Sequence, residues 1–115
     1  MIKNSEKINK PWGYEKIWAK TDKYVGKLLH INSGHKLSLQ FHRYKTETIL
    51  VLDGVLRVET DQESLVLNKG EAYHVEPGQV HRFCCDKNCE FVKLIEVSTP
   101  ELNDVVRLED SYGRS

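Results

Sequence analysis

Three side chains with the chemistry of metal ligands lie close together in one stretch of the chain, at Gln40, His42 and Glu47. Gln40 and His42 are two positions apart in an alternating segment, so in a β-strand both side chains face the same way. Glu47 follows a polar bend at 43–46, which turns the chain back towards the other two. An amide oxygen, an imidazole and a carboxylate together suit a borderline divalent ion: Zn, Mn, Fe(II), Co or Ni.

A fourth ligand is expected from a distant part of the sequence, and His81 is the best candidate. It opens an apolar run shortly after the turn residues Glu76-Pro77-Gly78. Three other histidines compete with it, namely His30, His35 and His74. The alternative for the whole group is an ordinary polar pair, because His and Glu on a strand more often satisfy each other than bind a metal.

The elements that must position these residues are short β-strands separated by turn residues. Apolar or alternating runs predict strands at 14–18, 24–31, 36–42, 48–52, 55–60, 64–67, 72–75, 81–85 and 91–97. Asp53-Gly54 is the strongest hairpin signal, because glycine adopts positive φ without strain. Segment 100–104 is the one candidate for a helical turn. Strands at this spacing predict an all-β barrel or sandwich whose interior holds one ligand.

The length and charge of the chain narrow the classes of partner. A chain of 115 residues is expected to form a single domain, 1–115. Seventeen basic residues balance seventeen acidic ones, so the net charge gives no indication of nucleic-acid or membrane binding. Basic residues nevertheless gather at 35–36, 42–45 and 81–82. Local patches of this kind in a neutral protein suit a small anion.

The three cysteines predict reduced thiols, since their number is odd and Cys84 and Cys85 are adjacent. Together with Cys89 and His81 they also lack the paired spacing of a structural zinc site. The N-terminus has no apolar core typical of a secretory signal, and no apolar run approaches the ~18 residues of a membrane-spanning helix. A cytoplasmic location is therefore expected.

Glycines frame the candidate ligands in two spaced patterns: Gly34-x5-Gln40-x-His42-x4-Glu47-x6-Gly54 and Gly70-x5-Glu76-x-Gly78-x2-His81. These patterns resemble the two cupin motifs, with Gln40 in place of the usual first histidine and Glu76 in place of the usual proline. The resemblance implies an all-β double-stranded β-helix, the cupin jelly-roll barrel. It also implies one divalent metal ion held by Gln40, His42, Glu47 and His81.

Further segments resemble type II mannose-6-phosphate isomerases over nearly the whole chain: Lys10-Pro11-Trp12-Gly13, residues 37–42, Ile95-Glu96-Val97 and residues 106–114. The resemblance implies a metal-dependent sugar-phosphate isomerase that interconverts mannose 6-phosphate and fructose 6-phosphate. Arg107 matches an arginine of the final motif and is expected near the substrate. Lys36 shares its predicted strand face with Gln40, so we count it with Arg107 as catalytic. The general base stays open between Glu96, His74 and Lys36.

Two alternative functions stay open. Thr48 stands directly after Glu47, where the isomerases often have histidine, and this favours a non-catalytic cupin that binds a sugar or nucleotide sugar. An iron-dependent dioxygenase is a third reading, and Gln40 argues against it because that chemistry usually relies on more histidine ligands. By analogy with small cupins that pair through sheet edges, we also expect a homodimer.

Overall fold

The computed structural model describes residues 1–114, which form eleven β-strands. These strands are β1 (Glu6–Lys10), β2 (Gly13–Lys20), β3 (Val25–Asn32), β4 (Leu39–Phe41), β5 (Glu47–Asp53), β6 (Leu56–Thr60), β7 (Ser64–Leu67), β8 (Ala72–Val75), β9 (His81–Cys84), β10 (Phe91–Ser98) and β11 (Val106–Glu109). The all-β prediction is confirmed. Among the residues described, no helix is long and apolar enough to cross a membrane.

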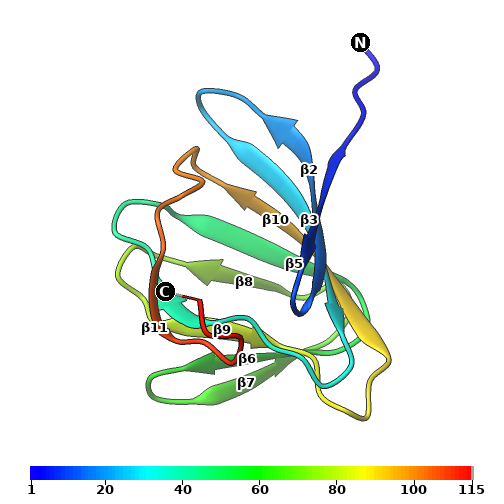
Figure 1. The fold of residues 1–115 in the computed structure, drawn as a ribbon, viewed down its shortest axis with the longest axis vertical. Helices are drawn as coiled ribbons and strands as arrows, with labels where there is room; N and C mark the ends of the chain where they lie inside the picture. The colour runs from blue at the N-terminus through cyan, green and yellow to red at the C-terminus, as the bar shows by residue number, and fades with distance from the viewer. Residues whose placement is uncertain (115) are drawn as a thin grey trace.

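The strands form two antiparallel sheets that face each other (Figure 1). The large sheet has the order β1-β2-β3-β10-β5-β8, and the small sheet has the order β11-β4-β9-β6-β7. Neighbours in each sheet are mostly distant in sequence, as when β10 pairs with both β3 and β5. Residues from the beginning, middle and end of the chain therefore meet between the sheets.

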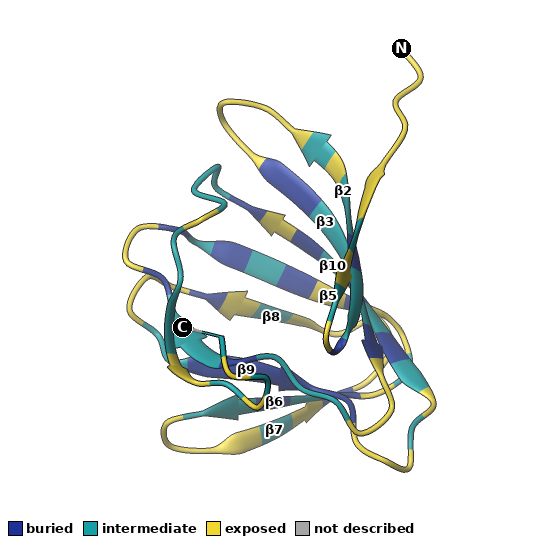
Figure 2. Cartoon of the chain, in the orientation of Figure 1, coloured by how far each residue is buried: buried dark blue, intermediate teal, exposed yellow. Residues whose placement is uncertain are grey.

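Alternation along the strands buries one face of each sheet. In β10 the inward residues Val92 and Leu94 are fully buried, while Val97 is 49% exposed on the outer face. Figure 2 shows this alternation as changes of colour along β5 and β10. Because successive side chains of a strand point to opposite faces, the sequence alternation is sufficient to create an inner apolar layer.

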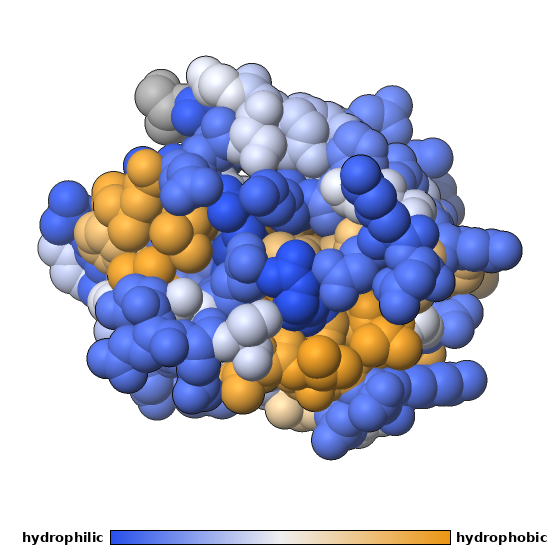
Figure 3. All heavy atoms as spheres, turned by 90° about the horizontal axis from the view of Figure 1, so that it is seen from below, coloured by the Kyte–Doolittle hydropathy of each residue, from blue (hydrophilic) through white to orange (hydrophobic). Residues whose placement is uncertain are grey.

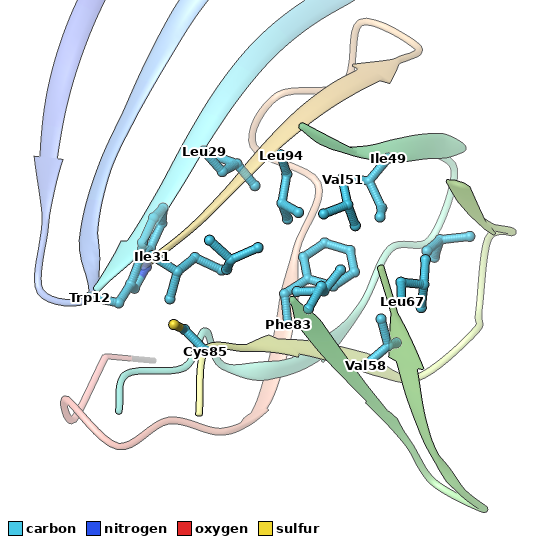
Figure 4. Close-up of a cluster of buried hydrophobic side chains, with 13 residues drawn as sticks. Trp12, Leu29, Ile31, Ile49, Val51, Val58, Leu67, Phe83, Cys85 and Leu94 are labelled. Atoms are coloured by element: carbon cyan, nitrogen blue, oxygen red, sulfur yellow. The ribbon is translucent and has the colours of Figure 1, made fainter. Parts of the chain in front are cut away.

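The inner layer forms one apolar cluster between the sheets. Leu29, Ile49 and Leu94 of the large sheet point towards Phe83 and Val58 of the small sheet (Figure 4). Burial of one such side chain is worth about 1.5–3 kcal/mol, so this cluster is the main source of stability. The remaining apolar surface forms patches among hydrophilic side chains on the face seen in Figure 3.

The turn between β5 and β6 requires a glycine. Gly54 has a φ of +83°, and a Cβ added there would lie 2.4 Å from the carbonyl oxygen of Phe91. Both the backbone conformation and the close approach therefore exclude a larger residue. The turn predicted at Asp53-Gly54 is present, but the prediction of a hairpin is wrong, because β5 and β6 belong to different sheets and do not pair.

The predicted strands differ from the observed ones at a few places. Strands 64–67 and 72–75 have the predicted bounds, whereas the predicted strand 36–42 shortens to β4 with a separate bridge between Lys36 and Cys84. The edge strands β1 and β11 were not predicted, because their sequences carry many charges. Segment 100–104 forms a turn and no helix. Its hydrogen bonds join residues that are close in sequence, such as Leu102 N–H to Pro100 O.

Candidate metal centre

Three residues from both sheets converge on one buried point. His42 follows β4, Glu47 begins β5 and His81 begins β9. Their side chains are no more than 2% exposed. Nε2 of His42 lies 2.6 Å from Oε1 of Glu47, and Nε2 of His81 lies 3.4 Å from the same oxygen. Candidate ligand atoms of all three lie within 4.8 Å of one another, which is the spacing that a single ion bridges.

The main chain fixes the orientation of both imidazoles. Nδ1 of His42 donates to the carbonyl oxygen of Asp104 at 2.6 Å, and Nδ1 of His81 donates to that of Gln79 at 2.9 Å. Each ring then presents Nε2 towards Glu47. Metal-ligating histidines usually donate their other ring N–H in this way, which selects the tautomer and the ring orientation.

The centre contains a buried polar atom that the protein leaves unsatisfied. Nε2 of His81 has no hydrogen-bond partner among the described residues, and its side chain is fully buried. A buried polar group without a partner costs free energy, so such an atom needs an explanation. A divalent cation beside His42, Glu47 and His81 satisfies it, so the residues fit the metal that the sequence implies.

A second carboxyl group lies beside Glu47. Glu96 comes from the inward face of β10, and burial followed by the charge of Glu47 raises its pKa well above the usual range. Burial acts to raise the pKa of Glu47 too, but its hydrogen bonds with Glu96 and His42, the nearby ring of His81 and the charge of Lys45 bring it well below the usual range. Glu47 is therefore the ionised member of the pair, which suits a metal ligand.

The bend between His42 and Glu47 is held from outside by a distant segment. The carboxylate of Asp104 accepts the N–H groups of Arg43, Tyr44 and Lys45 at 2.7–3.0 Å. These three bonds lower the pKa of Asp104 to about 2, against the opposing effect of desolvation. Sequence reasoning missed Asp104, and its only signal was an aspartate in a polar turn.

Gln40, the fourth predicted ligand, lies on the strand next to His81. The two residues are directly paired across β4 and β9. The side-chain oxygen of Gln40 accepts a hydrogen bond from the Ser38 hydroxyl at 2.7 Å. Gln40 and His42 also line the same cavity. Metal coordination by Gln40 remains a prediction.

The cavity beside the centre has a volume of about 560 Å³ and more cationic than acidic side chains in its lining. Five lysine and arginine residues line it among the residues described: Lys10, Lys27, Lys45, Arg107 and Arg114. The two carboxyl groups in the lining are Glu15 and Glu96. Glu15 forms ion pairs with Lys10 at 3.5 Å and Lys27 at 3.2 Å. The local charge therefore favours an anionic ligand.

The two residues predicted as catalytic are placed differently. Arg107 pairs with Gln40 across β11 and β4 and lines the cavity. Lys36 does not line it and instead lies in a separate hollow with Arg82 and Glu109. The expectation that Lys36 faces the metal ligands is wrong, because residues 36–38 leave the regular strand on which the alternation argument depended.

The competing histidines have other surroundings. His74 lies on the outer face, 2.8 Å from the Thr48 hydroxyl and 2.9 Å from Glu76. His30 stacks between Tyr14 and Phe91. The ring of His35 stacks on Tyr112, with 2.7 Å between Nδ1 and the phenol oxygen. Of the described histidines, only His42 and His81 belong to the converging group.

The architecture of the two sheets defines the class of protein as a cupin, as the glycine-framed motifs predicted. A solved RmlC-like cupin from Shewanella frigidimarina has the same fold, with a TM-score of 0.74 at 20% identity over 84% of each chain. Residues 1–110 match the family model described as "Mannose-6-phosphate isomerase C-terminal". The chain belongs to this family.

Its relatives are longer proteins. The mannose-1-phosphate guanylyltransferase ManC of Salmonella typhimurium is 35% identical over 112 residues, which are 93% of this chain and 23% of ManC. The xanthan biosynthesis protein XanB of Xanthomonas campestris is 30% identical over 95% of this chain and 24% of its own length. The chain thus spans about a quarter of these relatives.

The relatives overturn the predicted isomerase function. ManC is an enzyme named for guanylyl transfer, and a protein from Escherichia coli that is 34% identical carries the same name. The prediction of a mannose 6-phosphate/fructose 6-phosphate isomerase is therefore wrong. The motifs behind it specify the barrel and the candidate ligands, and different proteins share these without sharing a reaction.

Proposed function

We propose that this chain is a metal-binding cupin domain that holds a phosphorylated sugar, with mannose phosphates as the first candidates. The observation that carries the proposal is the convergence of His42, Glu47 and His81 beside a cation-rich cavity. The domain binds its ligand without isomerising it. In this proposal it serves guanylyl transfer to mannose 1-phosphate, the activity for which ManC is named.

The donor set supports a divalent ion with mixed nitrogen and oxygen ligands. Two imidazoles and one carboxylate suit Zn, Mn, Co, Ni or Fe(II), with Gln40 as the candidate fourth ligand. A bound ion of this kind holds and polarises the oxygen atoms of a sugar. The orphaned Nε2 of His81 is the structural feature that such an ion would satisfy.

The cavity lining supports an anionic ligand. Lys45 is only 6% exposed and lies on the bend between the ligands His42 and Glu47. Arg107 lines the cavity from β11, an edge strand of the small sheet. Arginine binds phosphate through two parallel hydrogen bonds and lysine acts as a point charge, so the pair suits a phosphate group.

Thermal unfolding of the purified protein tests the proposal. The protein is stripped with a chelator, reloaded with each divalent ion, and mixed with mannose 1-phosphate, mannose 6-phosphate, mannose or inorganic phosphate. We expect the metal to raise Tm and a mannose phosphate to raise it further, because a hundredfold excess over Kd stabilises the folded state by about 2.7 kcal/mol. Mannose and inorganic phosphate should each raise Tm by less than the mannose phosphates do.

Two lysines provide matched variants. Lys45→Gln removes a cation of the cavity, while Lys36→Gln removes one from the separate hollow. We expect at least tenfold weaker mannose-phosphate binding in the first variant and no change in the second. The absence of binding by every phosphorylated sugar to the metal-loaded protein would refute the proposal.

A further inference from the structure

Asp104 contacts the candidate metal centre from a segment that contributes no ligand. Its carbonyl oxygen accepts the Nδ1 hydrogen of His42 at 2.6 Å. Its carboxylate accepts N–H bonds from three consecutive residues, with Oδ1 bonded to Arg43 at 3.0 Å and Oδ2 to Tyr44 and Lys45 at 2.7 and 2.9 Å. One residue therefore fixes both the ring of a ligand and the chain that follows it.

The fourth N–H group of the bend is bonded by a residue close to Asp104 in the sequence. The N–H of Thr46, the last residue of the bend, donates to the hydroxyl of Thr99 at 3.1 Å, and Thr99 N–H donates back to Thr46 at 3.1 Å. All four N–H groups between His42 and Glu47 are thus satisfied by residues 99 and 104. Because three consecutive N–H groups converge on one carboxylate and the fourth on Thr99, these partners determine the shape of the bend.

The shape of the bend sets the distance between two ligands. Only four residues separate His42 from Glu47, and Nε2 and Oε1 lie 2.6 Å apart. We propose that Asp104 is the positioning residue of the metal centre, acting through the bend 43–46 and the His42 ring. This inference rests on the proposed metal function and adds to it a residue that touches neither metal nor ligand.

Replacement of Asp104 tests the inference through metal affinity. Zn²⁺ binding to the purified protein is measured by competition with a chromophoric chelator. We expect Asp104→Ala to weaken binding by about 10–100-fold, the range typical of outer-shell partners. The Zn²⁺ affinity of Asp104→Asn should lie between those of the wild type and Asp104→Ala. Its side-chain oxygen still accepts the Arg43 N–H, while its amide group cannot accept the N–H groups of Tyr44 and Lys45.

Two further variants separate positioning from a general loss of stability. Asp61→Asn removes an exposed carboxylate in the turn after β6 and should leave Zn²⁺ affinity unchanged. Thr99→Val removes only the acceptor of Thr46 and should weaken binding less than Asp104→Ala. If Asp104→Ala does not fold, Asp104→Asn and Thr99→Val decide the question, since both retain most of the native contacts.

The metal-free protein gives a second readout that does not depend on the proposed function. ¹⁵N NMR with hydrogen exchange reports the amides of the bend, and we expect those of Arg43, Tyr44 and Lys45 to exchange faster in Asp104→Ala than in the wild type, because the variant lacks their acceptor. Unchanged Zn²⁺ affinity together with unchanged exchange of these three amides in Asp104→Ala would overturn the inference. A wild-type protein that binds no divalent ion would overturn the proposed function alone, because the NMR comparison would still test Asp104.

Discussion

At the scale of single residues, the centre depends on which ring nitrogen each histidine presents. Both imidazoles donate from Nδ1 to main-chain carbonyl groups, at Asp104 and Gln79, and both Nε2 atoms approach Glu47. The ionised Glu47 accepts a hydrogen bond from Glu96 and lies against both Nε2 atoms, an arrangement that the proposed divalent ion would complete.

Alanine variants of the two histidines should lose the metal. His42→Ala and His81→Ala each remove one of three converging ligands, so we expect at least a tenfold fall in bound divalent ion, measured by elemental analysis after dialysis. His74→Ala is the matched control, because this histidine is 51% exposed on the outer face. Metal content that stays at the wild-type level in both buried variants contradicts the assignment.

The cysteines provide a prediction with a defined pH dependence. Burial raises the pKa of Cys84 to about 12 and that of Cys85 to about 11. The thiolate is the reactive form, so at pH 8 these two thiols should react with iodoacetamide far more slowly than an unfolded thiol and should speed up only above about pH 10. Mass spectrometry of the labelled protein measures this, with the urea-unfolded protein as control. Rapid labelling of Cys84 at pH 8 contradicts the expectation.

At the scale of elements, turns and register bring the ligands together. The sequence was sufficient to predict His42, Glu47 and His81 as a group, because glycine-framed spacing places each at the start or end of a strand. It was insufficient for Lys36, since residues 36–38 leave the strand, and for Asp104, whose contacts span about sixty residues. Alternation identifies the face of a regular strand, but irregular segments are shaped by tertiary contacts that no local pattern records.

Two glycines test how the turns are built. Gly54 and Gly70 both have positive φ, of +83° and +89°, but only Gly54 is close to backbone atoms of another strand. Gly70→Ala should cost about 1–2 kcal/mol of unfolding free energy from backbone strain alone. Gly54→Ala should cost clearly more, because its Cβ would meet the carbonyl oxygen of Phe91. Urea unfolding measures both, and equal losses contradict the role given to the close approach.

At the scale of the whole molecule, the two sheets leave four edge strands: β1 and β8 in the large sheet, and β7 and β11 in the small one. Edge strands present unpaired backbone groups, which a second copy of the chain can cover. The homodimer expected from the sequence is consistent with this arrangement and stays a prediction.

Light scattering coupled to gel filtration measures the mass directly. A homodimer should have twice the chain mass of 13.3 kDa over a range of protein concentrations. The stripped and metal-loaded proteins are compared, because the edge strands lie outside the metal centre and the mass should not change. A mass of 13.3 kDa at every concentration contradicts the prediction.

The contacts of Thr99 and Asp104 with the bend also bear on the order of biosynthesis. A ribosome releases the ligands His42, Glu47 and His81 well before it releases residue 104. Until that residue emerges, the amides of 43–45 lack their acceptor and His42 lacks the carbonyl that orients it. We therefore expect the nascent chain to bind the proposed ion only after residue 104 has left the ribosome.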